Sequence, residues 1–327
     1  MAIPTKSARG PVELDVRGPF DLAASTRFLE GFAPAARPDA AAEPELLRLA
    51  FPAEADWTPV GVAVRQHGGT VTVEVSGGTG GHDTRGTAGH DTRGTAGHDT
   101  VVSQVERILS LDVDGVGFPE VGRRDPVIGE LQARYPGLRP VSFHSPYEAA
   151  CWAIIGQRIR INQAAVLMSR LADQQGQVLT VAGRPVTAFP GPRQLRDGPL
   201  SGLPTVKAER LRAVATAALD GRLDAARLRS LDSQEALGEL AQLPGVGPFS
   251  AQLILARGAG HPDLFPRDER RLHEEMTRAY GLDEPTLEEL TVIADGWAPY
   301  RTWAGLLLRT RREDDTHEIR RGRRTPR

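Results

Sequence analysis

The stretch "LPGVGPFSAQLILARGAGHPDLFPRDERRL", residues 243–272, decides the fold of this chain. The sequence before it, "SQEALGELAQL", has the apolar spacing of a helix, and Pro244 ends that helix. Gly245 and Gly247 permit positive φ angles and a close backbone approach, and Pro248 suits the first position of a second helix. The stretch therefore predicts two helices joined by a short hairpin.

The hairpin residues Gly245, Val246 and Gly247 are also candidates for contact with phosphate. Backbone N–H groups at the start of the second helix carry partial positive charge, and glycine leaves room for an anion to approach them. A plain connection between two antiparallel helices would use the same residue types. The acids that follow the hairpin favour the functional interpretation.

Two neighbouring acids follow the second helix. That helix is expected to span residues 248–257, with Gly258 as its C′ residue. After the loop "AGHPDLFPR", Asp268 stands where the next helix, over residues 269–280, needs an N-cap. Glu269 falls in the first turn of that helix, where the helix dipole favours a negative charge. We therefore expect Asp268 to be the structural acid and Glu269 the freer one.

The composition limits the classes of protein to which the chain can belong. Its 327 residues, 40% of them hydrophobic, suffice for about two domains. The single cysteine, Cys151, excludes a disulfide framework, a four-cysteine iron–sulfur cluster and a zinc site made of cysteines alone, and we expect no metal site. No apolar run approaches the roughly 20 residues that span a bilayer, and "MAIPTKSARG" lacks the apolar core of a signal peptide. We therefore expect a cytoplasmic protein with no membrane contact.

The charges are unevenly distributed. A formal net charge of −2 gives no sign of nucleic-acid binding through overall charge. Nearly every cation is arginine, which suits phosphate better than lysine does, and residues 310–327 form an Arg-rich tail. A solvated, disordered end and a segment that contacts phosphate are both compatible with that tail.

The rest of the chain divides into three segments. Residues 11–76 combine period-two stretches, such as "VGVAVRQHGGTVTVEV", with a short helix, "DLAASTRFLEGF", and predict a small α+β domain. Residues 77–100 repeat the unit "GHDTRGTA" without any large apolar side chain, so we expect a disordered linker whose histidines lack the fixed geometry of a metal site. Residues 101–309 show a helical pattern almost throughout. The predicted class is α+β, with a small sheet domain followed by an all-α domain.

These motifs resemble a known family. "LPGVGPFSAQLILARG" followed by "DLFPRDERRL" is similar to the hairpin and downstream acid of the helix–hairpin–helix DNA glycosylase superfamily, and of its AlkA-type DNA-3-methyladenine glycosylases in particular. "GPFDLAASTRFLEGF", "EAACWAIIGQRI" and "WAPYRTWAGLLLR" follow in the order of that family. The resemblance implies a monomeric, nucleoid-associated enzyme of base excision repair that flips an alkylated base out of double-stranded DNA and hydrolyses its N-glycosidic bond.

The resemblance also implies which residues carry the chemistry. The catalytic aspartate of the family falls on Glu269, whose side chain is one methylene longer, and Asp268 is the alternative. Phe249 stands where superfamily members that also nick the strand carry a Schiff-base lysine, which implies a monofunctional enzyme. Phe249 itself would either line the base pocket or fill the core between helices.

The base pocket departs from the family pattern. Two of its aromatic positions fall on Leu253 and Arg309, so less aromatic surface is expected to face a cationic base. Trp297, Tyr300 and Trp303, at helical spacing, either complete the base pocket with Arg309 or belong to the core.

The DNA contacts implied by the family extend beyond the hairpin. The residue that fills the gap left by a flipped base corresponds to Arg158, which follows Gln157 in "GQRIRIN"; a surface arginine without such a role is the alternative. The resemblance leaves open whether the hairpin carbonyls hold a monovalent cation, and no other cofactor is expected. Two other functions remain open: a non-catalytic binder of damaged DNA that uses the same hairpin, and a glycosylase for another class of lesion.

Overall fold

The computed structural model describes residues 10–31, 43–76 and 92–317, and it confirms the α+β class. An antiparallel sheet comes first, built from β1 (Val12–Leu14), β2 (Leu46–Pro52), β3 (Pro59–His67) and β4 (Thr70–Ser76) in the order β1-β4-β3-β2. A helix, α1 (Leu22–Gly31), lies between β1 and β2 in the sequence. The period-two stretch "VGVAVRQHGGTVTVEV" forms a β-hairpin of β3 and β4, which turns at Gly68 and Gly69.

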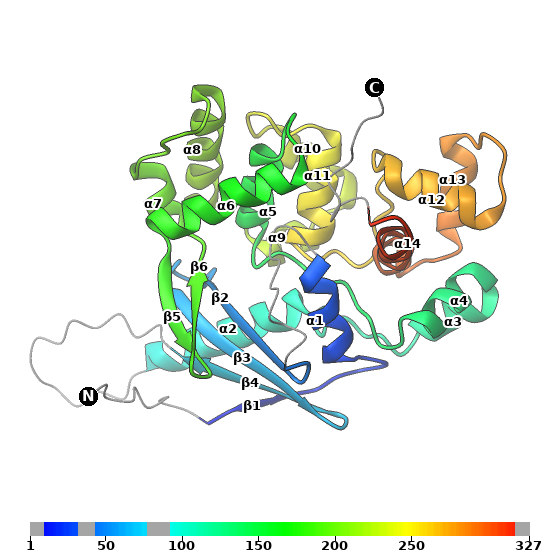
Figure 1. Ribbon diagram of the computed structural model, residues 1–327, viewed down its shortest axis with the longest axis horizontal. Coiled ribbons are helices and arrows are strands. Elements are labelled where there is room, and N and C mark those ends of the chain that lie inside the picture. Colours follow the sequence, from blue (N-terminus) through cyan, green and yellow to red (C-terminus); the bar gives the residue numbers. More distant parts are fainter. Residues whose placement is uncertain (1–9, 32–42, 77–91, 318–327) are drawn as a thin grey trace, which may run out of the picture.

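The sheet buries both of its faces, because strand side chains alternate between them. Leu47, Leu49 and Phe51 of β2 pack on one side in a core that includes Val105 and Ile108 of the helix α2 (Thr92–Ile108). Leu46 and Ala50 point to the other side, where a second hairpin covers them. That hairpin consists of β5 (Gln177–Val181) and β6 (Arg184–Ala188), and it lies alongside the sheet in Figure 1.

Three expectations about the segments were wrong in detail. The hairpin β5–β6 interrupts the region expected to be wholly helical, because "VLTVAGRPVTA" offers apolar side chains to the sheet. Residues 77–91 of the expected linker lie outside the described residues, but α2 begins at Thr92, since the burial of Val101 and Val105 supports a helix that continues toward its N-terminus.

The C-terminal helix also extends beyond residue 309, where the helical domain was expected to end. α14 spans Arg301–Thr316, well beyond residue 309, because Arg311 is buried and its Nε donates to Glu275 Oε1 at 2.6 Å. Residues 318–327 of the expected Arg-rich tail lie outside the described residues.

The remaining helices form two groups with separate cores (Figure 1). The first group contains α5 (Pro146–Ile155), α6 (Ile161–Gln175), α7 (Pro192–Asp197), α8 (Thr205–Leu219), α9 (Ala225–Ser230), α10 (Ser233–Ala241) and α11 (Pro248–Leu253), which continues as the π-helix η3 (Ile254–Gly258). The second group contains α3 (Phe118–Arg124), α4 (Pro126–Arg134), α12 (Arg270–Tyr280), α13 (Leu287–Asp295) and α14. α1 stands between the sheet and these helices in Figure 1.

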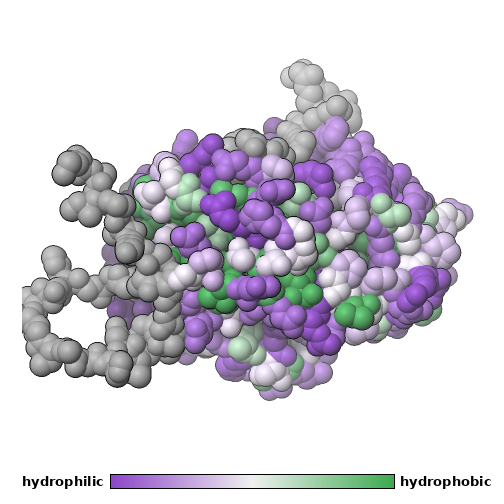
Figure 2. All heavy atoms as spheres, turned by 90° about the horizontal axis from the view of Figure 1, so that it is seen from below, coloured by the Kyte–Doolittle hydropathy of each residue, from purple (hydrophilic) through white to green (hydrophobic). Residues whose placement is uncertain are grey.

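One face of the molecule is drawn in Figure 2, seen from below Figure 1. Hydrophilic residues cover most of it, and hydrophobic residues gather near its centre. Within the described part of the chain, no helix has both the length and the apolar character needed to cross a membrane.

Candidate active site

The predicted helix–hairpin–helix is formed by α10, the hairpin and α11. Pro248 starts α11, with Gly247 as its N-cap. Gly245 has φ +86°, as expected, and a Cβ at this position would lie 2.6 Å from Arg210 Cδ. Gly247 has φ −95° and does not use the positive φ that glycine permits. A Cβ at Gly247 would meet no atom within 4 Å, which leaves the start of α11 open on that side.

Val246 does not take the role expected of it. Its side chain is buried, and its N–H donates to Leu243 O at 2.9 Å. Val246 is therefore a core residue of the hairpin, because the turn directs its side chain inward. The residues on either side of it are glycines and have no side chain to bury.

A second loop is bound to the hairpin. Gln157 Nε2 donates to Gly245 O at 2.5 Å, and Gln157 Oε1 accepts from Arg210 Nη1 at 2.8 Å. Lys207 Nζ donates to the carbonyls of Ile155 and Gln157 at 2.7 and 2.9 Å. Arg158, the next residue of this loop, is exposed and has φ +58°, an uncommon conformation for a residue with a Cβ.

Gly258 differs from its expected role as a helix C′ residue. The helix continues past Leu253 as a π-helix and ends only after Gly258. A Cβ at Gly258 would lie 2.8 Å from the Cβ of Ala149 and 2.9 Å from the Cα of Pro146, so this glycine allows η3 to approach α5. A π-helical turn of this kind is frequent at functional sites.

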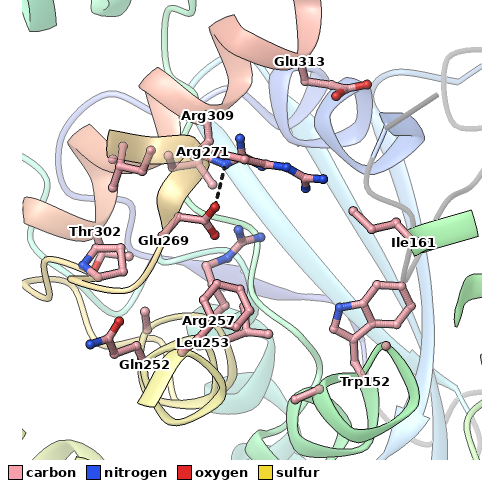
Figure 3. A pocket seen from close by; sticks show the side chains of 18 of the residues that line it. Trp152, Ile161, Gln252, Leu253, Arg257, Glu269, Arg271, Thr302, Arg309 and Glu313 are labelled. Carbon is pink, nitrogen blue, oxygen red and sulfur yellow. Dashed lines mark ion pairs between the residues drawn. The ribbon is translucent and has the colours of Figure 1, made fainter. Parts of the chain in front are cut away.

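A cavity of about 530 Å³ lies beside the hairpin, between the two helix groups. Its walls include Phe249 of α11, Trp152 of α5 and Phe28 of α1. Glu269 and Arg309 line it from the side of α12 and α14. Figure 3 shows Trp152 pointing into the cavity from α5, with Glu269 and Arg309 beside each other on the other side. A cavity of this size can take a nucleobase.

The N-cap position of α12 is occupied by Glu269 and not, as expected, by Asp268. α12 begins at Arg270, and Glu269 is its N-cap residue, but the Glu269 carboxylate makes no capping hydrogen bond. Asp268 is bound instead to Gln252, whose Nε2 donates to Asp268 Oδ2 at 3.0 Å. Asp268 was therefore wrongly expected to cap the helix, because the helix begins one residue later than predicted. Glu269 is the acid that lines the cavity.

The start of α14 fixes the loop that leads to these acids. Thr302 Oγ1 donates to His261 O at 2.8 Å and accepts from Leu264 N at 3.1 Å. Arg301 Nη1 pairs with Asp263 Oδ2 at 2.9 Å. The backbone before Glu269 is thus held at several points, as positioning of a reactive group requires.

One arginine lies beside the Glu269 carboxylate, and a second lines the same cavity. Arg309 Nε lies 3.9 Å from Glu269 Oε1, and each of the two side chains is 22% exposed. Arg257, from η3, also lines the cavity and lies over the ring of Phe28 at 5.3 Å. Burial, with a contribution from the charge of Arg309, lowers the pKa of Arg257 to about 10. Arg257 and Arg309 therefore line the same cavity as the Glu269 carboxylate.

Curated relatives share this sequence pattern, although no protein-family model matches the chain. The DNA-3-methyladenine glycosylase of Bacillus subtilis is 24% identical over 64% of this chain and 71% of that protein. A probable bifunctional transcriptional activator/DNA repair enzyme AlkA of Mycobacterium tuberculosis is 30% identical over 63% of this chain and 41% of that protein. DNA-3-methyladenine glycosylase 2 of Escherichia coli is 30% identical over 54% of this chain and 61% of that protein.

The chain is thus similar in sequence to AlkA-type DNA-3-methyladenine glycosylases. It covers less than two thirds of the mycobacterial and Escherichia coli relatives. Solved structures share its fold. A 3-methyladenine DNA glycosylase from Archaeoglobus fulgidus superposes with a TM-score of 0.70 at 20% identity, over 95% of this chain and 100% of that one. A Clostridium acetobutylicum 8-oxoguanine glycosylase/lyase bound to double-stranded DNA gives 0.55 at 17% identity, over 79% and 86% of the two chains.

Three aromatic residues considered for the base pocket lie elsewhere. Tyr300 is buried, and its hydroxyl donates to Asp114 O at 2.7 Å. Trp303 is buried against the ring of Phe118, and Trp297 Nε1 donates to Asp125 Oδ2 at 2.9 Å. These rings belong to the core of the second helix group, because they pack against apolar side chains of α3 and α4. The prediction that Tyr300 and Trp303 line the base pocket was therefore wrong.

Phe249, Leu253 and Arg309 do line the cavity. Phe249 is 45% exposed, so it does not fill the core. The cavity is also lined by three residues that were not predicted from the sequence: Trp152, Gln252 and Arg257. A usable signal for Trp152 was its position as the one large aromatic side chain late in the helix that leads to Gln157.

Proposed function

We propose that the protein is a monofunctional DNA glycosylase that removes damaged bases from duplex DNA by hydrolysis of the N-glycosidic bond, and that it acts as a monomer in base excision repair. The observation that carries this proposal is the position of Glu269. Its carboxylate lines a base-sized cavity beside the helix–hairpin–helix and has no capping role. The names of the relatives support an alkylated base as the substrate.

Glu269 supplies the negative charge that this hydrolysis needs. Departure of a base leaves an oxocarbenium-like sugar, and a nearby carboxylate stabilises it or directs water toward it. The carboxylate is only 22% exposed, so its interaction with a developing charge is stronger than in bulk water. Arg309, 3.9 Å away, orients the carboxylate toward the cavity.

The hairpin and the adjoining loop bind the DNA strand in this proposal. The open backbone at Gly247 and the start of α11 receive a phosphate. Gln157 ties the loop of Arg158 to the hairpin, so the exposed Arg158 lies near the bound strand and fills the space of the everted nucleotide. Eversion costs least for damaged or mispaired bases, which favours lesions over normal bases.

The absence of strand cleavage is part of the proposal. The sequence contains two lysines, Lys6 and Lys207. Lys6 lies outside the described residues, and Lys207 binds backbone carbonyls of the Gln157 loop. Among the described residues that line the cavity, none is a lysine. Phe249 at the Schiff-base position supports hydrolysis by water rather than attack by an amine.

The test measures base release and strand cleavage separately. The protein is incubated with methylated duplex DNA, released bases are quantified by chromatography, and strand breaks are counted before and after heating. We expect base release, heat-labile abasic sites and no product trapped by borohydride. Glu269→Gln should lower release at least a hundredfold, whereas Glu288→Gln, which changes an exposed acid paired with Arg267, should leave it unchanged.

Three results would contradict the proposal. Tight, salt-dependent binding to damaged duplexes without release would identify a non-catalytic binder. Full activity of Glu269→Gln would remove the carboxylate from the mechanism. A borohydride-trapped protein–DNA adduct would show a lyase.

A further inference from the structure

Resting on the proposed glycosylase activity, we propose that Arg107 is a positioning residue of the site, whose guanidinium group fixes the spacing of α5 and η3, two helices that line the cavity. Arg107 belongs to α2, and it is not among the residues that line the cavity. It therefore acts on the site only through the two helices. The hydrogen bonds of its guanidinium group carry the proposal.

Arg107 joins the start of α5 to the end of η3. Its Nη1 donates to Gly258 O at 2.5 Å, and its Nη2 donates to His144 O at 2.8 Å. Gly258 is the last residue of η3, and His144 directly precedes Ser145, the N-cap of α5. Because the guanidinium group is a rigid, planar fork of donors, it sets the distance between the two carbonyls that it binds.

The two helices are in close contact at the place that Arg107 binds. A Cβ at Gly258 would lie 2.8 Å from the Cβ of Ala149 and 2.9 Å from the Cα of Pro146. The N–H of Phe143 donates to the carbonyl of Arg257 at 2.7 Å. This contact leaves no room for a side chain, so a displacement of one helix end is transmitted along the helices and is not absorbed locally.

Both helices contribute to the wall of the cavity. Trp152 and Ala153 belong to α5, and Ala256 belongs to η3. Figure 3 shows the Trp152 side chain pointing into the cavity. η3 also leads directly into the loop of residues 259–268, which ends at Glu269. The group that fixes η3 against α5 therefore also fixes the start of the loop that carries the proposed catalytic group.

The aliphatic part of Arg107 packs against the turn that follows η3. Gly260 has φ +73°, and a Cβ at this position would lie 3.0 Å from Arg107 Cγ. In the same turn, Ala259 N donates to Ile254 O at 2.8 Å. Arg107 thus supports the end of η3 with its stem as well as with its charged group.

Arg107 is buried beside residues of the sheet domain that balance its charge. Its Nη2 pairs with Glu54 Oε1 at 2.9 Å, and the two side chains are 6% and 14% exposed. Gln104 Oε1 accepts from Glu54 N at 3.0 Å, and Gln104 Nε2 donates to His144 O at 2.9 Å. Burial raises the pKa of Glu54, and the charge of Arg107 opposes that shift. The connection between β2 and β3 therefore holds Arg107 in place from behind.

A gain in stability does not by itself account for an ion pair at this place. Replacement of a buried ion pair by apolar side chains of similar volume is often neutral or stabilising. Apolar side chains could not bind the carbonyls of His144 and Gly258 at the same time. The property that only the arginine supplies is therefore the fixed geometry of the two helix ends.

Three variants separate this geometry from stability. Arg107→Lys keeps a positive charge beside Glu54 and should fold, but an ammonium group lacks the planar fork that binds both carbonyls. The double variant Arg107→Met, Glu54→Gln removes the ion pair and leaves no unpaired charge in the interior. Glu54→Gln alone keeps the guanidinium group and its bonds to both carbonyls.

Arg139→Met is the matched control. Arg139 is also a buried arginine that binds backbone carbonyls, among them those of Pro19 and Ser110. Neither Arg139 nor these two residues line the cavity. The control should therefore lower the melting temperature without slowing base release.

The measurements are single-turnover base release from methylated duplex DNA, affinity for a duplex with a non-cleavable abasic-site analogue, and thermal melting. Arg107→Lys and the double variant should release base at least tenfold more slowly than the wild type. Both should bind the analogue within twofold of the wild type, because the hairpin is unchanged. Glu54→Gln and Arg139→Met should stay within threefold of the wild-type rate. A wild-type rate in both Arg107 variants, or rates that follow the melting temperature in all four proteins, would overturn the proposal.

Hydrogen exchange distinguishes failure of this inference from failure of the proposed function. Amide exchange of residues 254–261 is measured by mass spectrometry, with α10 as the internal reference. It should be at least tenfold faster in both Arg107 variants than in the wild type, while exchange in α10 is unchanged. A wild type without base release would refute the glycosylase, and the faster exchange would leave the hold of Arg107 on η3 standing. Unchanged exchange of residues 254–261 would refute the role of Arg107.

Discussion

Gln252 holds Asp268 by two hydrogen bonds, one to its side chain and one to its backbone. Gln252 Nε2 donates to Asp268 Oδ2 at 3.0 Å, and Gln252 Oε1 accepts from Asp268 N at 3.1 Å. Asp268 is thereby turned to α11, and the next residue, Glu269, is left to face the cavity. The buried amide of Gln252 therefore determines which of the two acids faces the cavity.

Removal of this amide should misplace the Glu269 carboxylate, the proposed catalytic group. Gln252→Ala is expected to slow base release about tenfold or more, because small displacements of a reacting group are costly. The free energy of unfolding should fall by roughly 1–2 kcal/mol through the lost hydrogen bonds. Single-turnover kinetics and urea denaturation measure the two effects. The exposed Gln234→Ala on α10 is the control, and an unaltered rate in Gln252→Ala would contradict the positioning role.

The two hairpin glycines should respond differently to substitution. Gly245→Ala forces a Cβ into a left-handed conformation and toward Arg210, so we expect a loss of about 1–2 kcal/mol in unfolding free energy. Gly247→Asp meets no neighbouring atom and should change stability by less than about 0.5 kcal/mol.

Gly247→Asp should nevertheless weaken duplex binding at least tenfold, because it places a negative charge where a phosphate is proposed to lie. Fluorescence anisotropy with a labelled duplex measures the affinity, and Gly247→Ala controls for size. Wild-type affinity in Gly247→Asp would show that the hairpin does not contact the strand.

Trp152 should support an everted base by stacking. Trp152→Ala is expected to weaken binding of lesion-containing duplex by roughly 1–3 kcal/mol, the usual value of a base–aromatic contact. Trp152→Phe keeps a ring face and should retain most of the affinity. Binding to undamaged duplex serves as the reference, since its bases stay in the stack. Equal losses on damaged and undamaged DNA would argue against a base contact.

His261 should make the free energy of unfolding decrease as the pH is lowered. Burial lowers its pKa below the ordinary value; nearby Asp263 opposes this shift and Arg229 adds to it. The folded state therefore favours the neutral ring, whose Nδ1 accepts from Asp263 N at 3.2 Å. This contribution to stability is present above the ordinary pKa of about 6.5 and is lost as pH falls through it.

The measurement compares urea unfolding at pH 7.5 and 5.5 for the wild type and His261→Gln. The wild type should lose more stability on acidification than the variant does. Identical pH dependence in the two proteins would show that His261 titrates in the same way in the folded and unfolded chains.

The sequence could indicate the hairpin and the acid because both depend on local chemistry. Proline and glycine define the ends of α10 and α11 wherever the rest of the chain lies, and the spacing to Glu269 follows from helix and loop lengths. The identity of the capping residue could not be predicted. It depends on Gln252, sixteen positions earlier, which competes for Asp268 and shifts the start of α12.

The aromatic residues show a second limit of the sequence pattern. Trp297, Tyr300 and Trp303 have helical spacing whether they face a ligand or a core, and only the packing of α3 and α4 against them decides between the two. Trp152 lies in a run so apolar that its exposure to a cavity gives no periodic signal. The extension of α2 to Thr92 likewise depends on the sheet that its later residues cover.

Arg27 and Phe28 of α1 line the same cavity as Glu269. The small first half of the chain is therefore not a dispensable appendage to the helical half. Removal of the residues that precede α2 would open one wall of the cavity and expose the apolar face that α2 packs against the sheet, so the hairpin and the acid alone would not form the proposed site.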